Sequence, residues 1–228
     1  MKSRKVEKSK SRRVKRATVS PLLCAIVIAL TLCLFDSSTL LFATTLQKLS
    51  LEEMTRASNR IVQAKCLSVE SRMEEGQVFT LATFEVTQTL AGEETTPRSP
   101  EAFAPTDRGK GRGTRTVVVR QLGGRVGNLH AVVPGAPLLA PGEEAILFLE
   151  RDPNARDAFM VVGLSQGHMR ILKEPATGRR QVRQSTLGAG IYDPQTKRVR
   201  PGTARQMPLE EFNRELRRTL ERVQPQGR

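Results

Sequence analysis

The sequence predicts a mainly β protein: a small antiparallel barrel with a short helix before it and an amphipathic helix after it. Two observations carry this prediction. Apolar and polar residues alternate with a period of two through much of residues 60–172, and glycine- or proline-containing turns interrupt the alternation. Helical periodicity is confined to two stretches, near residues 51–58 and 208–223. Short strands joined by tight turns are typical of a small barrel.

The first 43 residues form a leader that supplies about half of the chain's formal net charge of +14. A basic stretch is followed at residues 21–35 by the apolar run PLLCAIVIALTLCLF, the layout of a secretory signal peptide. Asp36 interrupts the apolar run, and a carboxylate inside a membrane span costs about 2.5–3.5 kcal/mol. We therefore predict cleavage after Ala43 and export to the periplasm or the outside of the cell. The alternative is an uncleaved inner-membrane anchor formed by residues 21–43, which are long enough to span a bilayer.

The cysteines indicate a domain without disulfide bonds. Cys24 and Cys33 lie in the leader, which leaves Cys66 alone in the rest of the chain. The alternation around Cys66 predicts that it is a small buried hydrophobic residue.

The domain begins with a helix and a hairpin. Ser50 and Glu53 have the spacing of a capping box, which predicts a helix over residues 51–58. Strands are expected at residues 60–71 and 77–90, joined by a turn at Glu74-Glu75-Gly76. One face of the second strand carries alternate small and apolar residues, namely Val78, Thr80, Ala82, Phe84 and Val86.

Residues 91–115 are rich in proline, glycine and charge and are predicted to be a disordered loop within the barrel domain of residues 44–206. The portion from Arg108 to Arg115 is basic, but no aromatic residues are interleaved with it. The sequence therefore favours a solvated loop over a nucleic-acid site.

The middle of the chain continues as strands. We expect them at residues 114–122 and 129–133, with a turn over residues 123–128 between them. Pro134-Gly135 and Pro141-Gly142 each predict a tight turn, because proline fixes φ and glycine supplies a positive φ. The strand at residues 143–150 has five consecutive apolar residues, Ala145 to Leu149, so both of its faces should be covered.

The chain ends in short strands and a helix. Strands are expected at residues 158–164, 168–172, 181–184 and 190–193. Residues 207–228 are predicted to be a closing amphipathic helix and tail, with one apolar stripe that should pack on the outer side of the Ala145–Leu149 strand. That stripe consists of Leu209, Phe212, Leu216, Leu220 and Val223.

One stretch has the spelling of a hydrolase motif. Gly163-Leu164-Ser165-Gln166-Gly167 matches G-x-S-x-G, which places a nucleophilic serine between a strand and a helix. Here a strand pattern follows the motif, and His168 is the only histidine downstream of Ser165. We therefore interpret the stretch as a glycine-bounded bulge or strand crossing. A serine hydrolase using Ser165 is the alternative.

No catalytic, cofactor-binding or metal-binding residue is predicted. His130, His168 and Cys66 do not fall at metal-ligand spacing. Gly124-Arg125-Val126-Gly127 has the spelling of a G-x-x-G loop, but strands flank it, so a hairpin turn is favoured. The adjacent acid pairs, such as Glu143-Glu144, are interpreted as solvated ends of helices, turns and strands.

The stretches LSLEEMTRASNRIVQAKC, VVVRQLGGRVGNLHAVVPGAPLLAPGEEAILFLE and VVGLSQGHMRI resemble a group of uncharacterised exported bacterial proteins over about residues 49–172. More remotely, the arrangement is similar to the netrin-like domain of the tissue inhibitors of metalloproteinases. This resemblance implies a barrel of the OB type. It does not extend to inhibition, because the inhibitors need a cysteine at the mature N-terminus and none lies near Ala43-Thr44-Thr45.

The sequence thus predicts a non-enzymatic exported binding module whose partner is an envelope or extracellular protein. Membrane contact would occur only through residues 21–43, if these remain uncleaved as the anchor of an envelope protein. The predicted contact surface is the turn beside the basic loop, with residues Gln121, Gly123, Gly124, Arg125, Gly127 and Asn128.

Overall fold

The computed structural model describes residues 44–92 and 115–223. Residues 1–43, 93–114 and 224–228 lie outside the described residues. The predictions of a cleaved leader and of a disordered loop concern these residues. Neither helix in the described ranges is long and apolar enough to cross a membrane.

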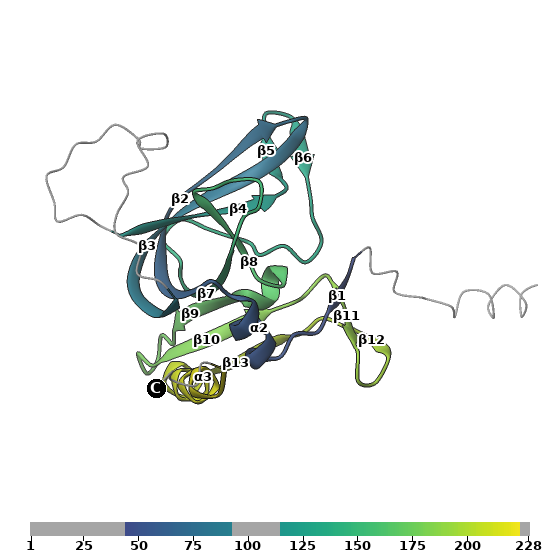
Figure 1. Cartoon of the computed structure of the whole chain (residues 1–228). Helices are drawn as coiled ribbons and strands as arrows, with labels where there is room; N and C mark the ends of the chain where they lie inside the picture. Colours follow the sequence, from purple (N-terminus) through teal and green to yellow (C-terminus); the bar gives the residue numbers. More distant parts are fainter. Residues whose placement is uncertain (1–43, 93–114, 224–228) are drawn as a thin grey trace, which may run out of the picture. The chain divides into compact units, whose positions relative to one another are not determined.

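Five strands of the main sheet form a partly closed ring (Figure 1). They pair in the order β2-β3-β4-β8, and β7 pairs with both β2 and β8, which brings the sheet back on itself. The pairing of β4 with β8 is parallel, so the expected barrel is not wholly antiparallel. The ring strands are β2 (Arg60–Glu74), β3 (Gln77–Gly92), β4 (Thr116–Leu122), β7 (Glu144–Arg151) and β8 (Ala158–Val161).

The same sheet continues beyond the ring, because two strands share the edge of β7 that faces away from β2. Its second half pairs with β8, and its first half pairs with β9, which is followed by β10 and then by β13 as the terminal strand. These added strands are β9 (His168–Lys173), β10 (Arg180–Ser185) and β13 (Ala204–Pro208). The predicted strands at residues 168–172 and 181–184 are therefore confirmed, whereas β13 was not expected.

Two small sheets complete the described domain. In the first, β1 (Thr45–Gln47) pairs in parallel with β11 (Gly190–Asp193), which pairs with β12 (Arg198–Pro201). The second is the hairpin of β5 (Gly124–Val126) and β6 (Leu129–Ala131). β11 was expected from the sequence, and β1 and β12 were not.

The expectation of a turn over residues 123–128 was wrong, because only Gly127 and Asn128 turn while the residues before them form β5. Gly123 and Gly124 have φ values of +96° and +130°, which place β5 close against β2 and β3. The Thr80 hydroxyl donates a hydrogen bond to the Gly123 carbonyl at 2.7 Å. A Cβ on Gly124 would lie 2.3 Å from the Thr80 hydroxyl oxygen. Glycine is required here by close approach as well as by φ.

β2 and β3 form the long hairpin that the alternation predicts. Glu75 and Gly76 both have positive φ, +47° and +79°, as a two-residue type I′ turn requires. Val78, Thr80, Ala82 and Phe84 are buried on the expected face of β3, and Val86 is half-buried. This face and the inner residues of the other ring strands fill the ring, so the ring encloses a packed core.

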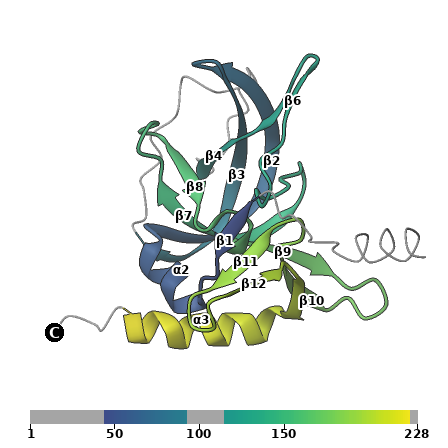
Figure 2. The same ribbon diagram turned by 90° about the vertical axis from the view of Figure 1, so that its right-hand side faces the viewer.

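The domain has a second core on the other side of β7. Leu147 and Leu149 point into the ring, while Ile146 and Phe148 pack with the helices α2 (Leu51–Ala57) and α3 (Leu209–Val223). Residues Ala145 to Leu149 all have 0% exposure, which confirms that β7 is covered on both faces. Figure 2 shows α3 running beside α2 and the β10 side of the domain.

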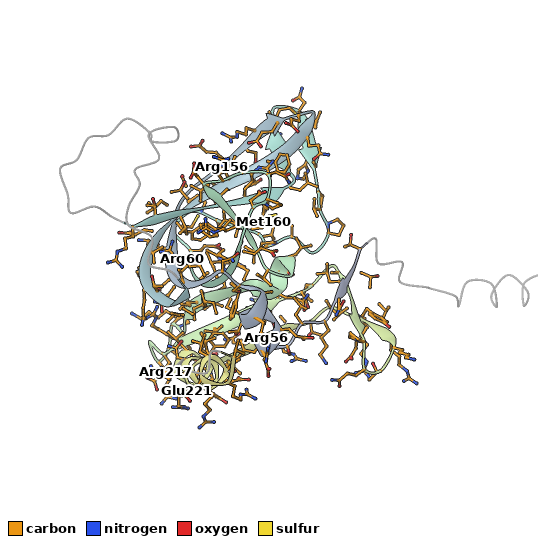
Figure 3. All side chains as sticks on the ribbon, viewed as in Figure 1. Arg56, Arg60, Arg156, Met160, Arg217 and Glu221 are labelled. Atoms are coloured by element: carbon orange, nitrogen blue, oxygen red, sulfur yellow. The ribbon has the colours of Figure 1, made fainter. Side chains whose placement is uncertain are left out.

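Both helices form where the sequence indicates, to within one residue at their ends. Before α2, the Ser50 amide donates to the Glu53 carboxylate at 2.7 Å, and the Glu53 amide donates to the Ser50 hydroxyl at 3.2 Å, so the capping box is confirmed. The hydrogen bonds that the Ser50 amide and then the Ser50 hydroxyl donate to the Glu53 carboxylate lower the pKa of Glu53. In α3, Phe212 and Leu216 are buried in the second core. Arg217 and Glu221, labelled in Figure 3, are exposed.

Candidate functional site

The G-x-S-x-G stretch is a short helical turn between two strands. Leu164–Gly167 form the 3₁₀ turn η1, entered through Gly163 at φ +63° and Leu164 at φ +57°. The expected bulge or crossing was therefore wrong, although the strand that follows the turn is confirmed. Gly167 has a packing role, because a Cβ there would lie 2.4 Å from the Val162 carbonyl oxygen.

Ser165 is buried at 5% exposure, and its hydroxyl has no hydrogen-bond partner among the described residues. Its amide donates to the Gly135 carbonyl at 2.9 Å, which fixes the turn against the Pro134-Gly135 connection. The imidazole of His168 is engaged elsewhere, with Nε2 3.1 Å from the Glu143 carboxylate. A serine nucleophile needs a base within about 2.6–3.2 Å of its oxygen, and the described residues supply none.

Gln166 is the residue of this motif whose side chain makes hydrogen bonds, and sequence reasoning did not single it out. Its side-chain oxygen accepts from the Leu49 amide, and its side-chain nitrogen donates to the Gln47 carbonyl, both at 2.9 Å. Its backbone carbonyl accepts from the Gln184 side chain at 2.7 Å. Gln166 therefore ties the segment before α2 to the turn and to β10.

Glu143 is not the solvated strand end that the acid pair suggested. Its side chain is 2% exposed and lies 3.1 Å from His168 and 3.3 Å from the Arg170 guanidinium. Burial, and after it the charge of Glu143, raises the pKa of the Cys66 thiol to about 11. Cys66 itself is 1% exposed, as expected, and such a thiol is a poor nucleophile at neutral pH.

Arg120 is the centre of another buried charged group. Its guanidinium lies 2.8 Å from Asp152, which is fully buried, and 2.9 Å from Glu74, and it stacks 3.5 Å over the Phe79 ring. Paired charges of this kind join β2, β4 and the turn after β7. These contacts give Arg120, Asp152 and Glu74 a structural role, because each charge is paired within the group.

An open cleft lies between the segment before α2, the β10–β13 edge of the main sheet, and α3. It consists of two hollows that share Lys48, Leu49, Gln184 and Arg205. The apolar hollow, of about 350 Å³, has a floor of buried or half-buried side chains: Met54, Met169, Met207, Val182 and Phe212. The polar hollow, of about 220 Å³, extends toward β11 and β12 and includes Asp193, Arg200 and Thr203.

The charges of the cleft are unevenly compensated. Lys48 donates a hydrogen bond to Asp193 at 2.9 Å, which lowers the pKa of that carboxyl group. Arg200 and Arg205 are exposed, and neither has a carboxylate partner within the ranges that the structure describes. At the other end of the apolar hollow, α3 contributes Glu215. Positive charge therefore dominates the polar hollow, whereas the charged residue that α3 adds to the lining of the apolar hollow is an acid.

The predicted contact surface is divided by the structure. The Gln121 side chain donates to the Pro137 carbonyl at 3.1 Å, Gly123 is hydrogen-bonded to β3, and Gly124 packs against Ser71 and Thr80. These three residues therefore have structural roles. Arg125, Gly127 and Asn128 are exposed at the tip of the β5–β6 hairpin. Contact through this tip stays a prediction.

Within the described ranges, no group of three or more histidine, cysteine, aspartate or glutamate side chains is placed to hold a metal ion. No protein-family model matches the chain, and a search of curated proteins finds no similar sequence.

Proposed function

We propose that this protein is an exported, non-enzymatic binding module whose partner is an envelope or extracellular protein. The observation that carries the proposal is the open cleft between α3 and the β10–β13 edge, which combines an apolar floor with two arginines that have no carboxylate partner among the residues described. Binding sites typically combine apolar lining with a few polar groups that orient the ligand. The buried Ser165 hydroxyl, with no base beside it in the described residues, argues against a serine hydrolase.

The proposed fold is of the OB type. Support comes from the ring, in which the first strand, β2, pairs with the second and fourth ring strands, β3 and β7, and the third pairs in parallel with the fifth. This connectivity is that of a five-stranded Greek-key barrel. Folds of this type serve many functions, so the fold adds nothing to the choice of partner.

Export rests on the basic and apolar leader, residues 1–43. Mass spectrometry of the protein made by cells tests it. A chain that begins at Thr44 supports release after cleavage, whereas one that begins at Met1 or Lys2 supports the membrane-anchored alternative.

Site-specific photocrosslinking tests the binding function. A photoreactive phenylalanine analogue at Met207, in the cleft, should crosslink the full chain to a protein of the envelope or medium. The same analogue at Glu75, in the remote β2–β3 turn, is the matched control and should not. Specific turnover of an ester, glycan or peptide by the purified chain, abolished by Ser165→Ala, would instead establish the hydrolase.

A further inference from the structure

The cleft contains enough chemistry to specify what kind of protein segment it takes. We infer that it binds an extended segment of a partner chain in which one large apolar side chain has carboxylates on one side of it, with the segment lying along β13. This inference rests on the proposed binding function and adds the recognition chemistry.

The apolar hollow matches a side chain in size and in character. Its volume, about 350 Å³, is at the low end of the range for ligand sites, roughly 300–1,000 Å³. It therefore has room for one or two large apolar side chains. Three methionines, Met54, Met169 and Met207, line it. Methionine side chains adapt their shape at low cost, which is typical of surfaces that accept protein segments.

β13 offers a main-chain edge beside this hollow. It is the terminal strand of the main sheet and leads directly into α3 (Figure 1). The consecutive residues Arg205, Gln206 and Met207 all line the hollow. Because successive side chains of a strand point to opposite faces, three consecutive lining residues place the strand's edge at the hollow. An added strand could hydrogen-bond to that edge while its alternate side chains enter the cleft.

The polar hollow determines the charge of the segment. Asp193 already neutralises Lys48, so the charge left for a ligand is that of Arg200 and Arg205. A guanidinium group pairs with a carboxylate through two parallel hydrogen bonds, which favours aspartate or glutamate. Glu215 at the far end of the apolar hollow repels a second acid there. The carboxylates of the segment should therefore lie on the β11–β12 side of its apolar anchor.

A library of random twelve-residue peptides displayed on phage, selected against the immobilised full chain, tests this inference. The enriched peptides should share a large apolar residue with aspartate or glutamate on one side. Their binding is then measured by fluorescence polarisation. The double variant Arg200→Gln/Arg205→Gln should weaken binding about fivefold or more, from two charge pairs at a partly exposed site. The matched double variant Arg179→Gln/Arg183→Gln removes two other arginines, which lie outside the cleft, and should leave binding unchanged.

Other results would overturn the inference. One is a consensus without acids or without an apolar anchor, and another is equal weakening by the two double variants, which would indicate general attraction to a basic protein. A third is displacement of the peptides by dodecanoate at lower concentration than by unlabelled peptide, which would indicate an amphiphile site. If Met207 still crosslinks to a partner protein in any of these cases, the binding function stands and only the recognition chemistry is wrong.

Discussion

Replacing Ser165 by alanine gives the sharpest test of how the motif stretch is interpreted. The side chain is 5% exposed and its hydroxyl has no partner in the described structure. A hydroxyl buried without a hydrogen bond costs about 1–3 kcal/mol, and alanine removes only the oxygen. The free energy of unfolding should therefore rise by about 1 kcal/mol, and Tm should rise by about 2–4 °C for a domain of this size.

The assay is urea unfolding of the full chain and its variants, with equal slopes as the sign that only stability has changed. Thr80→Val is the control, because this substitution should lower the free energy of unfolding where Ser165→Ala raises it. The Thr80 hydroxyl donates to Gly123 at 2.7 Å and is 3.1 Å from the Ser71 hydroxyl, so its removal should cost about 1–3 kcal/mol. A decrease of more than about 1 kcal/mol in the free energy of unfolding of Ser165→Ala would show that the hydroxyl does have a hydrogen-bond partner, contrary to this interpretation. Covalent labelling of Ser165 by a serine-directed probe would refute the reasoning altogether.

Three further predictions concern residues with other roles. With Cys24 and Cys33 replaced by serine, the Cys66 thiol should react slowly with a disulfide reagent at pH 8 in the native chain and rapidly in urea. Because its pKa rises from 9.0 to about 11 on folding, the unfolded thiol ionises first, and stability should fall as pH rises from about 9 to 11. Arg120→Met leaves the buried Asp152 carboxylate without its guanidinium partner, while Glu74 still contacts Arg72, and should cost about 3–5 kcal/mol in urea unfolding, whereas a small effect would show that Asp152 finds another partner. Gly124→Ala should lower Tm far more than Gly127→Ala, because a Cβ at Gly124 collides with β2 and β3 while the space around Gly127 is open, and equal losses would contradict the close approach.

Much of the fold follows from local patterns. The β2–β3 hairpin has alternation on both sides of a turn that needs two positive φ values, and β7 has the continuous apolar run of a strand covered on both faces. β1, β12 and β13 could not be found in this way. They are only three to five residues long, and most of their residues are exposed, so a period of two cannot be recognised in them. They are strands only because they pair with other strands in the folded domain, as β1 does with β11, far along the chain.

The site was less accessible to sequence reasoning than the fold. The cleft takes Lys48 from one end of the domain, Gln184 from β10 and Arg205 from β13, so no stretch of sequence has its signature. Glu143 was misjudged for a similar reason. Its neighbour Glu144 suggests solvent, but the pairing of β7 with β9 brings His168 and Arg170 against its carboxylate, and that register depends on the tertiary structure.

The position of β7 as the wall of both cores has a consequence for cooperativity. Neither core can melt while the other persists, because loss of either would leave one face of Ala145–Leu149 in water. The amides of this strand should be among the slowest in the domain to exchange with deuterium, opening only when the whole domain unfolds. A partner that orders the α3 side would then also protect the remote β2–β3 end, although it touches none of it.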